Sequence, residues 1–264
     1  MAGLLAGKVV MVSGIGPGLG QHLALHAARE GAHIAIGART AAKLDAVEAE
    51  VARLGLGVRV LKVPTDVRDA AQCKAFVAST AEHFGRVDVL INSAYVSGAY
   101  ALAAEADLDD WRETLNVNLF GAMALIQAVA PIMAAQGGGS IVNVNTKVTR
   151  LPYPTMGGYA VSKAALRMAT AQLAKELGGR KIRVNSVFPG WMWGPTVEDG
   201  FKARAASEGR SVAEIRAEIA QAIPLGDIPL DDDCARAIIA FASDYFLPVT
   251  GACLDLSGGE YLPL

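Results

Sequence analysis

Short apolar runs alternate with longer helical patterns along most of this 264-residue chain. Runs such as HIAIGA and VDVLIN are apolar at almost every position, which is typical of strands that are covered by helices on both faces. Repeated alternation of strand and helix indicates a parallel sheet of the α/β class. We therefore expect a doubly wound parallel sheet with helices on both faces.

The expected elements follow one another without a linker rich in Pro, Gly or Ser, so we expect a single domain over residues 1–264. The expected strands are KVVMVSG, HIAIGA, VRVLKVP, VDVLIN, SIVNVN, IRVNSVF and ACLDLS. The expected helices lie at about 19–31, 41–54, 72–85, 108–135, 158–177, 212–222 and 231–243.

Residues 188–229 interrupt the alternation of strands and helices. They begin with a segment rich in Pro, Gly and Trp and continue into the helical pattern at 212–222. An insertion after the sixth strand lies near the carboxyl ends of the strands, where open α/β sheets bind ligands. We therefore expect residues 188–229 to form a loop and helix that cover a substrate.

The composition argues against several classes of function. A formal net charge of −2 gives no electrostatic basis for binding nucleic acid or an anionic membrane. The most apolar expected helix, at 120–136, is interrupted by Gln127 and Pro131, so we expect it to fall short of a membrane span.

The cysteines and histidines point to a reduced, metal-free protein. Cys73, Cys234 and Cys253 are scattered and odd in number, which favours free thiols in a cytoplasmic protein over a disulfide framework. His22 and His26 share a helix face, but the sequence offers no recognisable Cys or acidic partner to complete a ligand set. We therefore expect no metal site.

The stretch VSGIGPGLG follows the first expected strand and opens the first expected helix. Glycine allows a tight turn and close approach of a ligand to the backbone, and a helix N-terminus offers free N–H groups to a phosphate. Such a loop also fits S-adenosylmethionine, or a helix that merely packs tightly on a strand. The predicted cofactor-binding residues here are Ser13, Gly14, Gly16, Pro17, Gly18, Leu19 and Gly20.

The end of the second expected strand helps to distinguish the nucleotides. An acidic residue there usually holds the free ribose hydroxyls of NAD, but this chain has Ala38 followed by Arg39. A guanidinium can bind a 2′-phosphate, and no carboxylate repels it. The pattern favours NADP(H), leaves NAD(H) as an alternative, and disfavours a methyltransferase, unless Arg39 is only a solvated loop residue.

Several motifs occur together in the order known from one enzyme family. They are the glycine loop, Asp66 in PTDV, Asn92 after the fourth strand, Asn118 in VNLFG, Tyr159-x-x-x-Lys163 and Pro189-Gly190. In this combination the chain resembles a short-chain dehydrogenase/reductase of the common type of roughly 250 residues, over essentially its whole length. The resemblance implies a Rossmann-type fold and an NAD(P)(H)-dependent oxidoreductase that interconverts a ketone or aldehyde and an alcohol.

Tyr159 and Lys163 lie four residues apart and therefore share one face of a helix. A free tyrosine has a pKa of about 10, which a nearby ammonium and a cationic nicotinamide ring would lower. We expect Tyr159 to act as general acid or base toward the substrate oxygen while hydride moves to or from the nicotinamide. The resemblance implies that Lys163 also holds the nicotinamide ribose.

The resemblance carries further roles onto individual residues. Thr146 stands thirteen positions before Tyr159, where the family has a substrate-orienting serine, and Asn118 would support a proton-relay water. If the fifth strand continues to Lys147, the neighbours of Thr146 point away from the site. The remaining implied cofactor-binding residues are Asp66 and Val67 beside the adenine, then Asn92, Ser93, Ala94, Pro189 and Gly190.

Aromatic residues suggest the kind of substrate. Tyr95 replaces a glycine of the family pattern, and Trp191, Met192 and Trp193 follow the sixth expected strand. Large aromatic side chains in such a loop favour a hydrophobic carbonyl or alcohol substrate, although they can also pack the loop against the protein. The resemblance implies a homo-oligomer, either a dimer or a tetramer. The alternatives are an S-adenosylmethionine-dependent methyltransferase and a catalytically silent nucleotide-binding protein.

Overall fold

A parallel sheet of seven strands forms the centre of the computed structural model, which describes residues 2–263. The strand order is β3-β2-β1-β4-β5-β6-β7, and every pairing is parallel. This confirms the predicted α/β class and doubly wound sheet. The strands are β1 (Val9–Ser13), β2 (His33–Ala38), β3 (Val60–Pro64), β4 (Val89–Asn92), β5 (Gly139–Val144), β6 (Ile182–Pro189) and β7 (Cys253–Leu256).

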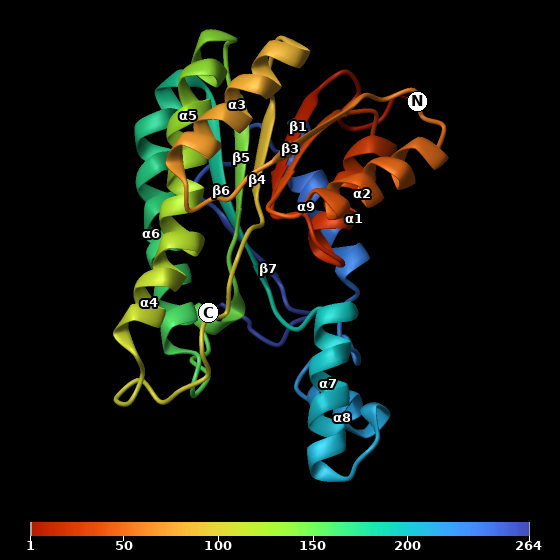
Figure 1. The fold of residues 1–264 in the computed structure, drawn as a ribbon, viewed down its shortest axis with the longest axis vertical. Helices are drawn as coiled ribbons and strands as arrows, with labels where there is room; N and C mark the ends of the chain where they lie inside the picture. Colours follow the sequence, from red (N-terminus) through yellow and green to blue (C-terminus); the bar gives the residue numbers. More distant parts are fainter. Residues whose placement is uncertain (1, 264) are drawn as a thin grey trace.

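Helices cover both faces of the sheet, as Figure 1 shows. One face carries α1 (Leu19–Arg29), α2 (Ala41–Arg53) and α9 (Asp231–Ala242). The other carries α3 (Ala70–Phe84), α4 (Leu108–Leu115), α5 (Ala122–Ala135) and α6 (Gly157–Leu177). A hairpin of α7 (Pro195–Glu208) and α8 (Val212–Ala220) projects beyond the sheet.

Two hydrophobic cores form because successive strand side chains point to opposite faces of the sheet. In β1, Val10 and Val12 pack into the core beneath α1, α2 and α9. Met11, between them, packs into the core beneath α3, α5 and α6. The unbroken apolar run Val9–Val12 of β1 therefore reflects burial on both sides, as the sequence pattern predicted.

α4 and α5 are joined by a π-helical turn at Asn116–Gly121, so the helix runs without a break over Leu108–Ala135. Our expectation that Gln127 and Pro131 leave this segment too short to span a membrane was wrong, because its 28 residues suffice by length and composition. Half of its most apolar window is buried inside the protein. The apolar residues of α5 belong to the core shared with α3 and the sheet.

α7 was not among the predicted helices. It begins at Pro195, directly after an extended Gly194, and proline is favoured in this first helical position since it lacks the N–H that would remain unpaired there. It ends at Gly209, whose φ of 64° is left-handed and suits glycine. α8 begins at Val212 as predicted, because Ser211 and Glu214 form a capping box.

Candidate active site

The glycine loop between β1 and α1 is shaped by close backbone contacts. Gly14 has a φ of 89°, and a Cβ there would lie 2.3 Å from the backbone nitrogen of Ala94. A Cβ on Gly20 would lie 2.3 Å from the carbonyl oxygen of Gly14. At Gly16, by contrast, a Cβ would meet no heavy atom of the described residues within 4 Å. The loop is therefore rigid at both ends and open at Gly16, where a ligand can approach.

The first turn of α1 offers its N–H groups at this opening. Gly18 precedes the helix, and no side chain in residues 2–263 caps the turn that follows it. Uncapped N–H groups at a helix N-terminus carry partial positive charge and bind phosphate oxygens. These N–H groups and the open space at Gly16 are compatible with a phosphate-binding loop, whose role stays a prediction.

The expected adenosine end of the site combines opposite charges. Arg39 is exposed directly after β2. Hydrogen bonds from Arg68 hold the pKa of Asp66 below its usual range, and the positive charge of Arg39 lowers it further. Asp66 accepts bonds of 3.0 Å from Arg68 Nε and 2.5 Å from Nη2. Its carboxylate is thus committed to Arg68, so the predicted contact of Asp66 with adenine has no support here and stays a prediction.

Val67 packs against the π-helical turn. A Cβ added to Gly121 would lie 2.8 Å from the Cβ of Val67. This close contact fixes Val67 between the adenosine end of the site and the helix that carries Asn118.

A chain of buried polar side chains links the carboxyl ends of the strands, and we did not predict it. Ser13 Oγ donates to Asn92 Oδ1 at 3.4 Å, and Asn92 Nδ2 donates to Asn143 Oδ1 at 2.9 Å. Asn143 Nδ2 in turn donates to Thr170 Oγ1 of α6 at 2.9 Å. Since Asn92 is engaged in this chain, its side chain fastens β1, β4 and β5 together rather than reaching into the site.

Ser93 and Ala94 form the wall beside the glycine loop. Ser93 donates its N–H to the carbonyl oxygen of Ser13 at 3.0 Å, and the backbone of Ala94 lies against Gly14. These two predicted cofactor-binding residues therefore lie next to the loop, while their neighbour Asn92 is part of the framework.

Thr146 lies beside the phenol of Tyr159. β5 has already ended at Val144, so the expected alternation of side chains does not extend to Lys147. Thr146 instead precedes a 3₁₀ turn at Lys147–Thr149, and its Oγ1 accepts a 3.3 Å bond from the N–H of Val148. The side chain of Thr146 lies beside the Tyr159 phenol and opposes the rise in its pKa that burial causes. The structure thus brings together the two predicted hydroxyl groups.

Lys163 is almost completely buried, with 2% of its surface exposed. Its Nζ donates to the carbonyl oxygen of Val144 at 2.7 Å. Burial lowers the pKa of Lys163 to about 7. Burial also raises the pKa of Tyr159, and repulsion from Tyr95 adds to this. Burial of the phenol therefore dominates its pKa, and the lowering that we expect from an ammonium together with a cationic nicotinamide ring stays a prediction.

Asn118 lies in the π-helical turn and is buried. Its Oδ1 accepts from the N–H of Val96, and its Nδ2 donates to the carbonyl oxygen of Val96, both at 2.9 Å. Nδ2 also donates to Ser162 Oγ at 2.9 Å, and Ser162 Oγ donates to the carbonyl oxygen of Tyr159. Both amide protons are therefore committed, and the side chain ties the loop after β4 to the helix that carries Tyr159.

Aromatic side chains lie on both sides of the site. The ring of Tyr95 is half exposed and lies 6.1 Å from that of Tyr159. Trp191 and Trp193 each pack edge to face on Phe201, at 5.5 and 5.7 Å. Arg216 covers Trp193 at 4.3 Å. The two tryptophans therefore belong in large part to the small core of the α7–α8 hairpin, and this packing accounts for much of their apolar surface.

Gly190 and the C-terminal segment meet at the carboxyl end of β6. Gly190 donates its N–H to the carbonyl oxygen of Leu256 at 3.2 Å, directly after Pro189 ends β6. Lys147 forms a buried ion pair with Glu260. The sequence contained no signal for this pair, since its members are 113 residues apart.

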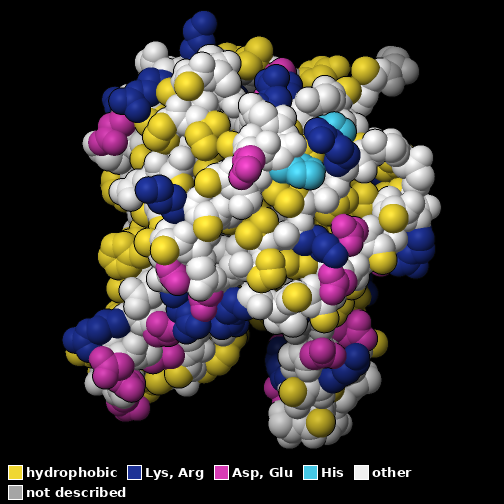
Figure 2. All heavy atoms as spheres, turned by 45° about the horizontal axis from the view of Figure 1, so that its top comes forward, with side chains coloured by type: hydrophobic (Ala, Val, Ile, Leu, Met, Phe, Trp, Pro, Cys, Tyr) yellow, Lys and Arg dark blue, Asp and Glu magenta, His cyan; other side chains and the backbone are white. Residues whose placement is uncertain are grey.

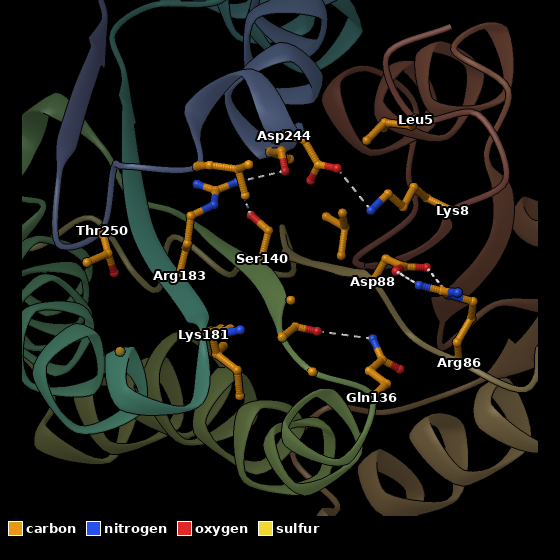
Figure 3. A pocket seen from close by; sticks show the side chains of 18 residues that line it. Leu5, Lys8, Arg86, Asp88, Gln136, Ser140, Lys181, Arg183, Asp244 and Thr250 are labelled. Carbon is orange, nitrogen blue, oxygen red and sulfur yellow. Dashed lines mark hydrogen bonds and ion pairs between the residues drawn. The ribbon is translucent and has the colours of Figure 1, made fainter. Parts of the chain in front are cut away.

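Figure 2 shows a notch between two lobes at the bottom of the molecule. One lobe contains α4 and the loops near it, and the other is the α7–α8 hairpin. A separate cavity of about 540 Å³ lies at the opposite, amino ends of the strands (Figure 3). Its Lys8, Arg86 and Arg183 are already bonded to other groups of the protein, and it contains none of the predicted site residues.

Comparison with known proteins supports an enzyme of this architecture. The family model described as enoyl-(acyl carrier protein) reductase matches residues 14–260. The chain is 36% identical over 255 residues to the 3-oxoacyl-[acyl-carrier-protein] reductase FabG of Thermotoga maritima, covering 97% of this chain and 98% of that protein. It is 35% identical to an L-rhamnose 1-dehydrogenase (NAD(P)(+)) of a Sphingomonas strain, with 99% of both covered.

A solved structure is also closely similar. L-sorbose reductase from Gluconobacter frateurii, determined in complex with NADPH and L-sorbose, superimposes with a TM-score of 0.94 over 100% of both chains at 28% identity. The similarity in fold therefore extends over the α7–α8 hairpin as well as the sheet.

Proposed function

Because the chain belongs to the short-chain dehydrogenase/reductase family, whose members are oxidoreductases, we propose that it interconverts a ketone or aldehyde and an alcohol with NADP(H). The observation that carries the proposal is the placement of the Thr146 side chain beside the phenol of Tyr159, with buried Lys163 one turn along α6. Membership of this family leaves no support for the methyltransferase alternative.

The residues around the glycine loop fit a dinucleotide. Gly16 has open space where a side chain would stand, and the N–H groups of Leu19 and Gly20 can bind a pyrophosphate, whereas that of Gln21 already donates to the carbonyl oxygen of Gly16. When bound, NADP(H) would supply or accept the hydride. The protein would hold its phosphates at this loop, and Pro189 and Gly190 lie at the carboxyl end of the neighbouring strand β6.

Proton transfer is assigned to Tyr159. In reduction, its hydroxyl donates a proton to the substrate oxygen, and in oxidation the phenolate takes the proton from the alcohol. Thr146 orients the same oxygen, since its hydroxyl is both a donor and an acceptor and already lies beside the phenol. Lys163, with a pKa of about 7, changes its charge near neutral pH and so adjusts the potential at the phenol.

The preference for NADP(H) rests on Arg39. Its exposed guanidinium follows the uncharged Ala38, so a 2′-phosphate would find a cation there. Asp66, whose pKa the charge of Arg39 lowers, is already held by Arg68. The printed names of relatives include both an NADPH complex and an NAD(P)(+) enzyme, so NAD(H) is the alternative to be tested.

A fluorescence titration with NADPH and NADH tests the cofactor assignment. We expect NADPH to bind more tightly to the wild type, and the difference to collapse in Arg39→Ala. Arg180→Ala is the matched control, because Arg180 is also exposed but lies beyond α6 at the amino ends of the strands. Equal binding of both nucleotides to the wild type would show that Arg39 is not the determinant.

The substrate is proposed to be a small, hydrophobic carbonyl or alcohol. Tyr95 and Tyr153 support this, since each exposes more than half of its surface near the start of α6. Trp191, Met192 and Trp193 remain candidates for the far side of the notch, but the packing of the tryptophans on Phe201 gives them less free surface. The hairpin within residues 188–229 is proposed to cover the substrate.

We also propose that the protein is a homo-oligomer that pairs through α5 and α6. Phe120, Val161 and Met168 expose 59%, 46% and 65% of their surfaces on this side, and Val161 and Met168 share one helix face. Hydrophobic side chains are visible on the α5–α6 side of Figure 2. Light scattering on Val161→Glu/Met168→Glu tests this, since a smaller assembly than the wild type is expected.

A further inference from the structure

Two histidines on α1 and an aspartate on α9 converge on one point, although they are far apart in the sequence. The ligand atoms of His22, His26 and Asp232 all lie within 4.8 Å of one another. His22 Nδ1 and His26 Nε2 lie 3.0 and 2.7 Å from the same oxygen, Oδ1 of Asp232. From these contacts we propose that the three residues form a binding site for a divalent transition-metal ion, with Zn²⁺ as the best match.

The sequence pattern explains half of this arrangement. His22 and His26 stand at positions i and i+4 of α1, so their rings project from the same helix face. We predicted no metal because no acidic partner was recognisable nearby. The partner is Asp232, which comes 206 residues after His26 and is brought there by the packing of α9 on α1.

The distances and exposure suit a tetrahedral ion. Zinc bonds of about 2.0 to 2.1 Å to nitrogen and oxygen place tetrahedral ligand atoms about 3.3 Å apart. The His–Asp separations of 3.0 and 2.7 Å need only a small expansion to reach this value. The side chains of His22 and Asp232 are about one quarter to one third exposed, so an ion can enter and a water can be its fourth ligand.

Asp231 supplies the hydrogen-bond acceptor that the second ring nitrogen of a metal-binding histidine usually has. If His22 binds the ion through Nδ1, its Nε2–H faces Asp231 Oδ1 at 3.4 Å. Asp231 exposes only 8% of its surface, and its Oδ2 has no hydrogen-bond partner among residues 2–263. This second oxygen lies near Gly18 of the phosphate-binding loop. A bound ion would therefore fasten α9 to the start of α1 beside the cofactor site.

The local charge also favours a dication. The first turn of α9 carries Asp231, Asp232 and Asp233, and the neighbouring cation is Arg236. Three carboxylates and one guanidinium leave a net charge of −2, which an ion of charge +2 neutralises. Arg236 approaches Asp232 through the other carboxylate oxygen, Oδ2, so Oδ1 stays available to the ion. Two imidazoles and one carboxylate are ligands that suit Zn²⁺.

Metal titration of the full chain, purified without a histidine tag and treated with a chelator, tests the proposal. Calorimetry with Zn²⁺ is expected to show one saturable site, and Co²⁺ is expected to give the visible absorption of a tetrahedral complex. His22→Gln and Asp232→Asn should each remove this binding. Asp231→Asn should weaken it by roughly 10- to 100-fold, as expected for an outer partner of a ligand.

The two remaining histidines provide the matched control. His33→Gln/His83→Gln leaves only the α1 pair and is expected to bind Zn²⁺ as tightly as the wild type. Circular dichroism checks that each variant is folded, and the partly exposed His22 is changed in preference to the buried His26. The proposal is overturned if the wild type shows no saturable binding, or if binding survives in folded His22→Gln or Asp232→Asn. It is equally overturned if only the control variant loses binding.

Discussion

Burial of Lys163 makes the stability of the protein depend on pH in a specific way. The folded protein lowers the pKa of Lys163 from 10.5 to about 7 because burial disfavours the ammonium. Between these two pH values the unfolded chain binds more protons at this lysine than the folded protein does. The free energy of unfolding therefore rises with pH in this interval, and below pH 7 the full cost of the buried charge is present.

The size of the effect follows from the change in pKa. Each pH unit in the interval contributes about 1.36 kcal/mol, so the whole effect is about 5 kcal/mol. Lys163→Met keeps the aliphatic stem but removes the titrating group. The wild type should therefore gain about 3 kcal/mol of stability relative to Lys163→Met between pH 7 and 9.5. Loss of the bond to Val144 adds an offset that does not depend on pH.

Urea unfolding at a series of pH values from 6.5 to 9.5 measures this difference. Lys175→Met is the matched control, because Lys175 lies on the same helix but is exposed, and it should follow the wild type at every pH. A difference between wild type and Lys163→Met that stays constant within about 0.5 kcal/mol would refute the reasoning. It would mean that Lys163 carries its charge in the folded protein without a cost from burial.

Three further predictions concern Gly14, Gly16 and the hydroxyl of Thr146. Gly14→Ala should destabilise the protein by more than about 2 kcal/mol in urea unfolding, because its Cβ would collide with the backbone of Ala94 at a left-handed φ. Gly16→Ala should leave stability within about 0.5 kcal/mol but weaken NADPH binding, since the new methyl fills the open space; equal stability losses would contradict this. Thr146→Ser should keep most of the turnover measured with a carbonyl panel, whereas Thr146→Val should lose roughly 100-fold; equal activities would remove Thr146 from the mechanism.

The elements that depend on local patterns were predicted well from the sequence. β2 has the bounds His33–Ala38 that the run HIAIGA indicates, and α6 begins one residue before its predicted start. The pattern of apolar residues shows directly which positions are buried. A strand that is covered on both faces is apolar throughout, and a helix that packs on the sheet has one apolar face. The order of the motifs also predicted that Thr146 and Tyr159 share a site, and in the structure their side chains lie beside each other.

The features that were missed depend on packing between distant segments. The bonds from Asn92 to Asn143 and Thr170 form only when β4, β5 and α6 are assembled, and no spacing in the sequence encodes them. The same holds for Asp232, which reaches His26 only after α9 packs on α1. α7 was missed for a local reason, since it has Gly200 in its interior and buries only Phe201 and Ala205, so its sequence shows no clear apolar stripe.

The π-helical turn illustrates how a correct motif can be assigned an incomplete role. Asn118 was predicted to support a water, and its side chain is instead bonded to Val96 and Ser162. A π-helical turn contains one more residue than an α-helical turn, and such turns are often found at functional sites. The sequence pattern does not reveal this extra residue. The support of a water by Asn118 stays a prediction, and its structural role in holding the loop after β4 is what the contacts show.

Comparison of wild type with Tyr159→Phe tests the central proposal most directly. Turnover is measured as loss of NADPH absorbance with a panel of hydrophobic ketones, and NADPH binding is measured on the same samples by fluorescence. The proposal predicts that Tyr159→Phe loses turnover by roughly 100-fold or more while its affinity for NADPH stays within a few-fold of the wild type. Undiminished turnover in the variant, or a wild type that binds NADPH but reduces no ketone that the panel contains, would contradict it.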